Sequence, residues 1–354
     1  MALFGGKKAK PVVGLDIGSS AVKAVELRKT KEGFELVSVG LEPLAPETVV
    51  DGAIIDAPSV SAAIERIFAQ QKIKNKNVAT SVSGHSVIIK KVTMPNLPED
   101  ELYDQVHGEA GQYIPFDIAD VNLDYQVLGL SPTGDQVELL LVAVKKEKIS
   151  NYTSALSLAG RSVVMVDVDA FAIQNAYEMN YQPDPTQTAA LLNIGASVMN
   201  INIVRGGAPL FTRDVSVGGN QYTDALQKEL ELTFEDAESL KRGQQVAGVS
   251  EEQKLSILRS VSEILALEIQ KTFDFFRATA SGEFINHIFV AGGSARIPGL
   301  LEMMRDEFQL PVDELDPFRR VTYNPAKFSD EYIHEVAPRL AVAVGLGLRS
   351  FDLV

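Results

Sequence analysis

The chain has 354 residues, no cysteine, and 33 basic against 47 acidic side chains, which gives a formal net charge of −14. This length predicts about two domains, and the lack of cysteine excludes disulfides and thiolate metal sites. Nucleic-acid binding depends on positive charge, so we expect no nucleic-acid partner. The longest apolar run, residues 340–348, is too short to span a bilayer, and the N-terminus lacks the apolar core of a secretory signal. We therefore expect a cytoplasmic protein without a transmembrane segment of its own.

The chain opens with a basic segment, residues 1–10, that we expect to be flexible. The β-rich residues 12–17 stop at Gly18, which predicts a strand that ends in a tight turn. Two further strands are predicted over residues 21–27 and 34–39, so the first half begins with a meander.

Helical patterns fill the spaces between strands. Ser59 can cap the first helix, and Pro298 suits the first position of a later one. The longest helical stretch, residues 220–276, should break near Gly243 and Gly248. The predicted helices cover residues 59–71, 98–113, 148–158, 170–179, 220–276 and 337–348. Alternating strands and helices predict an α/β fold.

One short pattern occurs twice. Residues 15–18 (Leu-Asp-Ile-Gly) recur as residues 192–195 (Leu-Asn-Ile-Gly), and each opens a strand–turn–strand segment. A repeat of this length predicts two related halves. Residues 86–164 interrupt the first half with a helix and the predicted strands 121–128 and 136–144, enough material for a small α+β subdomain.

Three glycine-bearing strand ends are the candidate ligand sites: residues 16–20, 193–197 and 291–294. Tight turns present N–H groups and hydroxyls to phosphate oxygens, and Asp16 can hold Mg²⁺ through water. A glycine loop that leads into a helix also favours anions. Each loop, taken alone, fits an ordinary turn better than a ligand site. The sequence contains no Walker P-loop, no metal-ligand spacing of histidines and no nucleophile elbow.

The order of these motifs resembles the actin/DnaK/FtsA ATPase superfamily. The segment 237–242 is similar to the helix that contacts ribose and adenine in that superfamily. The resemblance spans nearly the whole chain and implies two duplicated RNase H-like halves around a cleft that binds ATP and Mg²⁺. The other segments that carry it are residues 14–23 and 191–204 as phosphate motifs, 288–300 as the adenosine motif, and 167–177 and 337–348 as connecting helices.

A narrower resemblance is to the PilM family, the actin-like cytoplasmic component of the type IV pilus machine. Residues 109–116, 120–127 and 211–219 carry it. It implies an ATP-binding adaptor that binds the N-terminal cytoplasmic peptide of the inner-membrane protein PilN and supports pilus assembly and twitching motility. Through PilN the chain would be recruited to the cytoplasmic face of the inner membrane and join the pilus complex there. Self-association is a further expectation.

The peptide groove is expected between the inserted subdomain and the first half. Tyr113, Pro115 and Phe116 either line that groove or pack in a core.

The resemblance also implies domain boundaries and site residues. The first half (1A) would comprise residues 11–85, 165–187 and 338–354, the FtsA-type inserted subdomain (1C) residues 86–164, and the second half (2A) residues 188–337, with 2B at about 231–282. The implied cofactor-binding residues are Gly18, Ser19, Ser20, Lys23, Gly195, Ala196, Ser197, Glu238, Lys241, Gly292, Gly293 and Ser294. Asp16 would hold Mg²⁺ through water, and Asn193 is a second candidate metal contact.

The second phosphate motif departs from the superfamily pattern at Asn193, where most members carry aspartate. Asparagine cannot act as a base and brings no charge to a metal, so we expect at most slow ATP hydrolysis. Asp169 matches an acidic position in the first connecting helix of DnaK-type chaperones and is the remaining candidate to orient water; the alternative is a helix N-cap.

Two other functions stay open. One is an FtsA-like filament-forming cell-division protein, against which the missing C-terminal membrane tail argues. The other is a sugar-kinase-like phosphotransferase, for which no catalytic aspartate stands out.

Overall fold

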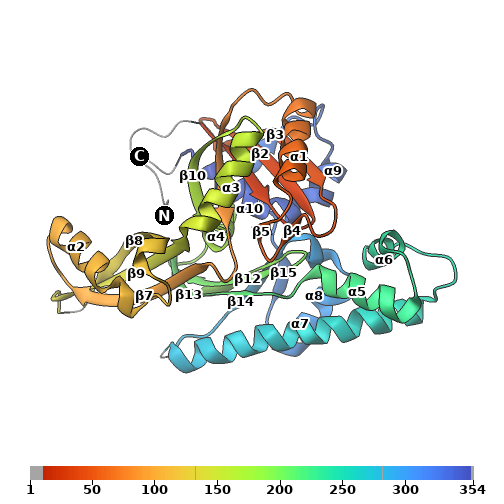
Figure 1. The fold of residues 1–354 in the computed structure, drawn as a ribbon. Coiled ribbons are helices and arrows are strands. Elements are labelled where there is room, and N and C mark those ends of the chain that lie inside the picture. Colours follow the sequence, from red (N-terminus) through yellow and green to blue (C-terminus); the bar gives the residue numbers. More distant parts are fainter. Residues whose placement is uncertain (1–10, 132, 281, 352–354) are drawn as a thin grey trace.

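The computed structural model describes residues 11–131, 133–280 and 282–351. The expectation of a flexible segment over residues 1–10 lies outside this range. Two mixed sheets with helices between and around them form the body of the molecule, and a smaller sheet projects from one side (Figure 1). Within the described residues, no helix has the length and apolar character needed to cross a membrane.

The first half contains a six-stranded sheet in the order β10-β6-β1-β2-β3-β16. Strand β1 pairs antiparallel with β2 and parallel with β6, so a meander continues into the parallel crossovers of an α/β fold. A two-stranded ladder of β4 and β5 follows the meander. The strands of this half are β1 (Val13–Ile17), β2 (Ala21–Lys29), β3 (Phe34–Pro43), β4 (Val49–Val50), β5 (Ala53–Ile54), β6 (Asn77–Val82), β10 (Ser162–Val168) and β16 (Val321–Tyr323).

The second half contains a five-stranded sheet in the order β13-β12-β11-β14-β15. Strand β11 pairs antiparallel with β12 and parallel with β14, as β1 does with β2 and β6. The predicted duplication is therefore confirmed at the level of topology. These strands are β11 (Thr188–Ile194), β12 (Met199–Arg205), β13 (Ala208–Val215), β14 (His287–Ala291) and β15 (Val312–Glu314).

The helices follow the predicted order, except that the helix Asp330–Val336 was not predicted, and three helix ends differ from the prediction. Helix α1 is capped by Asp56, whose carboxylate accepts from the Ser59 N–H at 3.1 Å, so the prediction of Ser59 as the cap was wrong. Helix α8 begins after Gly299, whose left-handed φ of 82° puts Pro298 outside the helix. The stretch 220–276 also breaks at Glu231, where φ is 53°. The α-helices are α1 (Ala57–Gln70), α2 (Glu99–Glu109), α3 (Lys146–Leu158), α4 (Asp169–Tyr181), α5 (Gly219–Leu230), α6 (Phe234–Lys241), α7 (Glu251–Thr279), α8 (Leu300–Phe308), α9 (Asp330–Val336) and α10 (Ala341–Leu348), with short 3₁₀ turns η1 (Ala110–Gln112), η2 (Ile118–Asp120), η3 (Gly293–Arg296) and η4 (Ala337–Leu340).

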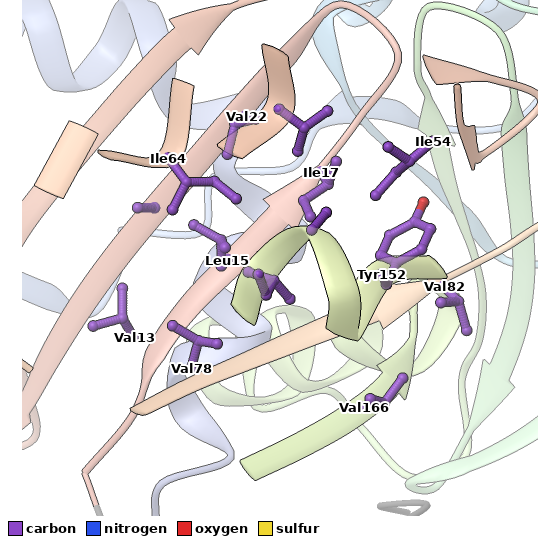
Figure 2. Packing of buried hydrophobic residues seen from close by; sticks show 14 of the residues in the cluster. Val13, Leu15, Ile17, Val22, Ile54, Ile64, Val78, Val82, Tyr152 and Val166 are labelled. Atoms are coloured by element: carbon purple, nitrogen blue, oxygen red, sulfur yellow. The ribbon is translucent and has the colours of Figure 1, made fainter. Parts of the chain in front are cut away.

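The inserted subdomain is a three-stranded sheet in the order β7-β9-β8, with α2 and its own apolar core. Its strands are β7 (Val87–Pro95), β8 (Val121–Leu130) and β9 (Gln136–Lys145). It ends at Lys145 rather than at the expected residue 164, because β10 pairs with β6 and α3 packs on the first sheet. Figure 2 shows Tyr152 of α3 and Val166 of β10 among the core residues around Leu15.

Two further segments differ from the expected boundaries. Strand β16 pairs with β3, and α9 packs in the same core, so both lie with the first half although residues 188–337 were assigned to the second. Helix α7, within the expected 2B range, packs on the second sheet.

The two halves are joined through α4 and α10, which pack against each other at backbone distance. A Cβ at Gly345 of α10 would lie 1.7 Å from the carbonyl oxygen of Ala172 in α4. A Cβ at Gly14 of β1 would lie 2.0 Å from the Ala343 carbonyl oxygen. Only glycine permits this approach, which explains the small-residue composition of α10.

Gly345→Ala should destabilise the protein by about 3 kcal/mol or more, since the added methyl overlaps backbone that cannot rotate away. Gly108→Ala in α2 is the matched control, because a Cβ there meets nothing within 4 Å. Alanine at that exposed helical position should raise stability by roughly 0.5–1 kcal/mol. Urea unfolding of both variants measures the difference, and a wild-type midpoint for Gly345→Ala would contradict the close packing.

Candidate functional site

The first candidate phosphate loop connects β1 to β2. Asp16 and Lys23 are opposite each other across these strands, and their side chains form an ion pair at 2.8 Å. Lys23 reaches over the loop, because a Cβ at Gly18 would lie 2.8 Å from its Nζ. Ser20 is exposed, and its carbonyl accepts from the Leu44 N–H at 3.0 Å. The loop therefore brings a cation and hydroxyls close together.

The second loop connects β11 to β12 and is tied to the start of α5. The N–H groups of Gly219 and Asn220 donate to the carbonyl oxygens of Gly195 and Ala196 at 2.9 and 2.8 Å. A Cβ at Gly218 would lie 2.5 Å from the Gly195 oxygen, so this contact also needs glycine. The loop and the helix start form one rigid wall.

The third loop, after β14, packs directly on the second. Gly292 has a φ of 90°, and a Cβ there would lie 2.3 Å from the Ile194 carbonyl oxygen. The Ser294 hydroxyl donates to the Gly195 carbonyl at 3.2 Å. Gly293 follows at the start of η3. The second and third glycine loops predicted from the sequence are thus brought together, although 99 residues separate Gly195 from Ser294.

The two halves meet at the loops themselves. The hydroxyls of Ser19 and Ser197 hydrogen-bond to each other across 178 residues of sequence. A ligand that contacts both loops must replace this hydrogen bond with its own, which phosphate oxygens can do.

Glu238 and Lys241 lie beside the start of α5. Glu238 accepts hydrogen bonds from Lys241 and, at 2.5 Å, from the Thr223 hydroxyl. Burial opposes ionisation of Glu238, yet the charge and hydrogen bond of Lys241 hold its pKa below the usual value. Lys241 also donates to the Gly219 carbonyl at 3.3 Å. Both predicted residues therefore border the second and third loops.

Arg339 belongs to the same region and was not predicted. Its Cγ would lie 4.0 Å from a Cβ at Gly293. Burial, together with the charge of Arg242, lowers the pKa of Arg339. A partly buried cation beside a glycine loop suits an anion. Nothing in the sequence indicated Arg339 as a site residue, because a single arginine after a proline is not part of any recognisable motif.

Asp169 begins α4 but does not cap it, because Val168 is the N-cap residue. Its carboxylate instead accepts from the Ser81 hydroxyl at 2.6 Å, so the alternative of an N-cap was wrong. Burial and the charge of Asp16 raise the pKa of Asp169 to about 6, against the opposing hydrogen bonds of Ser81 and Ser83. A carboxyl with this pKa can accept a proton near neutral pH.

Asn193 is held by a neighbouring strand, since its amide nitrogen donates to Asn200 Oδ1 at 2.8 Å. Across the described ranges, no three histidine, aspartate or glutamate side chains lie close enough to hold a metal ion. A magnesium ion at Asp16 would therefore need most of its ligands from water and phosphate.

A cavity of about 680 Å³ lies elsewhere, and Tyr181, His287 and Arg319 are among its lining residues. His287 begins β14, whereas Gly292 follows the end of that strand. The cavity is therefore at the opposite end of the sheet from the three loops and contains none of the predicted site residues.

The model of the family described as type IV pilus assembly protein PilM matches residues 14–351. The chain belongs to the PilM family. A solved PilM-PilN type IV pilus biogenesis complex has a similar chain, at 27% identity and a TM-score of 0.87, over 97% of this chain and 99% of that one. The family match favours a role in pilus assembly over the cell-division and phosphotransferase alternatives.

More distant relatives share the fold. The cell division protein FtsA of Pseudomonas aeruginosa is 23% identical over 350 residues, which cover 86% of this chain and 83% of FtsA. MreB5 of Spiroplasma citri bound to AMPPNP is 14% identical with a TM-score of 0.54, over 98% of this chain and 97% of that one. The expected actin-like fold is thereby confirmed.

Asp169→Asn should stabilise the protein at pH 7.5 by roughly 2–3 kcal/mol, because a tenfold change in proton affinity corresponds to about 1.4 kcal/mol. The raised pKa means that the folded state binds the proton more tightly. Above about pH 6 the ionised Asp169 therefore lowers the free energy of unfolding. This destabilisation becomes smaller as the pH falls through that value and Asp169 takes up a proton. The added stability of Asp169→Asn over the wild type should therefore vanish near pH 4.

Urea unfolding between pH 4 and 8 checks this, with the exposed Glu307→Gln as the control. A variant that gains nothing at pH 7.5 would contradict the buried, charged state of Asp169.

Proposed function

We propose that this chain is an ATP-binding adaptor that binds the cytoplasmic N-terminal peptide of a PilN-type inner-membrane protein and thereby takes part in pilus assembly and twitching motility. The observation that carries the proposal is the likeness to the PilM chain of the PilM-PilN complex over nearly the full length of both chains. Such an adaptor reaches the cytoplasmic face of the inner membrane through its partner and needs no membrane segment.

The meeting of the three glycine loops supports the nucleotide part of this proposal. Bound Mg-ATP supplies a polyphosphate whose negative charge is complementary to the cations that border the loops. Gly18, Ser19, Ser20 and Lys23 would hold phosphate oxygens from the first half, and residues 195–197 would do so from the second. MreB5, which has the same fold, was solved with AMPPNP.

The nucleoside would lie against the third loop. Gly292, Gly293 and Ser294 would contact it there, and Glu238 and Lys241 lie near this loop beside the start of α5. Arg339 adds positive charge next to Gly293.

The metal and the hydrolysis chemistry follow from the carboxylates. Asp16, ion-paired with Lys23, would hold Mg²⁺ through water, with Asn193 as a second contact. Asp169 would orient water, since the charge of Asp16 and its own burial keep its proton affinity high. With an amide at Asn193 in place of a carboxylate, we infer slow hydrolysis at most.

The peptide would bind between the inserted subdomain and the first half. Phe116 lies at this junction, because Lys145, which ends β9 and leads into α3, places its Nζ 4.4 Å from the ring centre. Tyr113 and Phe116 are partly buried against the core of the subdomain, whereas Pro115 is exposed. The partial burial leaves ring edges available to an apolar peptide side chain.

A fluorescently labelled N-terminal peptide of the cognate PilN should bind the full chain saturably, while a scrambled peptide should not. Fluorescence anisotropy measures this directly. Equal, non-saturating signals for the two peptides would remove the adaptor proposal and leave the family and the fold unaffected.

Asp16→Ala should weaken Mg-ATP binding at least about tenfold, because it removes the carboxylate next to the phosphate loop. Peptide affinity in the absence of nucleotide should stay unchanged. Isothermal calorimetry measures the first quantity, with Glu307→Ala as the control. Unchanged Mg-ATP affinity in Asp16→Ala would exclude this carboxylate as the metal contact.

A further inference from the structure

Three polar side chains form a row across the second sheet. Asn193 of β11 is directly opposite Asn200 of β12, and Asn200 is directly opposite Asp214 of β13. The side chains hydrogen-bond in sequence: Asn193 Nδ2 donates to Asn200 Oδ1 at 2.8 Å, and Asn200 Nδ2 donates to Asp214 Oδ1 at 2.8 Å. Only 2% of Asn200 is exposed. The row thus extends from the second phosphate loop to the edge of the sheet.

The row continues into the first half. The second carboxylate oxygen of Asp214 accepts from the Gly84 N–H at 2.6 Å. Gly84 lies in the turn between β6 and β7, where the chain leaves the first sheet for the inserted subdomain, and its φ is 87°. The Val87 N–H donates to the Gly84 carbonyl at 3.0 Å, so the start of β7 is fixed to the same turn. Asp214 therefore connects the second half to the turn at Gly84, which leads from the first sheet into the inserted subdomain.

The row also explains the amide at position 193. An asparagine side chain presents an oxygen on one side and an NH₂ group on the other, so Asn200 can serve one donor and one acceptor. Asp214 takes the NH₂ group, and the residue at position 193 must then be a donor. A carboxylate there would face the Asn200 oxygen and leave a buried polar group without a partner.

Asn193 is also placed to respond to a ligand. It lies two residues before Gly195, and its Oδ1 would be 2.9 Å from a Cβ at Gly292. The amide is therefore enclosed between the second and third loops. A ligand that separates these loops, or that bonds to the amide, changes the first hydrogen bond of the row.

We propose that the Asn193–Asn200–Asp214 row couples nucleotide occupancy of the cleft to the inserted subdomain and thereby sets the affinity of its peptide groove. This inference rests on the proposed function. Asp214 acts here as a positioning residue: it touches neither ligand, and it holds the Gly84 turn in the place that the second half dictates. Coupling of this kind is reciprocal, so the peptide must change nucleotide affinity by the same factor.

Asp214→Asn is the sharpest variant, because a carboxamide has one oxygen and must lose either the Asn200 or the Gly84 hydrogen bond. Asp214→Ala removes both. Asp184→Asn is the matched control: Asp184 also accepts from a backbone N–H and a hydroxyl, both of Thr186, at 2.8 and 2.7 Å, but on an exposed loop that does not join the halves.

The experiment measures peptide affinity by anisotropy with and without Mg-ATP, and Mg-ATP affinity by calorimetry with and without peptide, on the full chain. For the wild type and Asp184→Asn, each ligand should change the affinity of the other about fivefold or more. In Asp214→Asn the affinity for each ligand alone should stay within about threefold of wild type. The coupling factor, by which one ligand changes the affinity for the other, should fall to about one. If Asp214 had only a structural role, its replacement would lower the affinities for peptide and Mg-ATP and leave the coupling factor unchanged.

Two results overturn the coupling role. In the first, both Asp214 variants keep the coupling factor of the wild type. In the second, the wild type binds both ligands but neither changes the affinity for the other. If the wild type binds no peptide, the proposed function fails. Hydrogen–deuterium exchange of residues 83–95 with and without Mg-ATP then decides the coupling. A nucleotide-induced change that is lost in Asp214→Asn supports it, and no change in the wild type overturns it.

Discussion

The arrangement of the whole molecule depends on one contact: the backbone of α10 lies directly on the backbones of α4 and β1. Gly345 against Ala172 and Gly14 against Ala343 leave no room for a side chain. This contact fixes the separation of the two sheets, since α4 and α10 lie between them (Figure 1). The loops that follow the related strands β1 and β11 lie next to each other, as the hydrogen bond between Ser19 and Ser197 shows.

The connection between the halves differs from one side to the other. Around α4 it is apolar, with Ile173, Tyr177, Leu191 and Phe289 in one buried cluster. At the loops it consists of hydrogen bonds, such as that between the Ser19 and Ser197 hydroxyls. Apolar packing at one side holds the halves together, while hydrogen bonds can be exchanged for those of a ligand at modest net cost. This asymmetry suits a contact between the loops that a ligand can replace.

The inserted subdomain has a core of its own and joins the first half through the turn at Gly84 and the junction at Lys145. The other face of its sheet packs in the core of the first half, where Leu140, Val142 and Val144 of β9 are buried, so apolar contacts as well as these two covalent connections hold it in place. The Asp214 carboxylate acts on the first of these connections from the other half. Three parts of the chain thus meet at one partly buried polar contact.

The sequence by itself determined most of the strands and helices in their order, the duplication, the three glycine loops and the family, because these are properties of local periodicity and short motifs. It located Asp16, Lys23, Ser197 and Ser294 through their loops. It missed Asp214, and it placed α3 and the first residues of β10 (162–164) in the inserted subdomain instead of the first half. Only the tertiary structure decided these points, since the Asp214–Gly84 contact joins residues 130 positions apart and β10 belongs to a sheet whose other strands are distant in the chain. A local stretch of sequence does not indicate such pairings, because the two partners are distant in the chain and come into contact only when both sheets have formed.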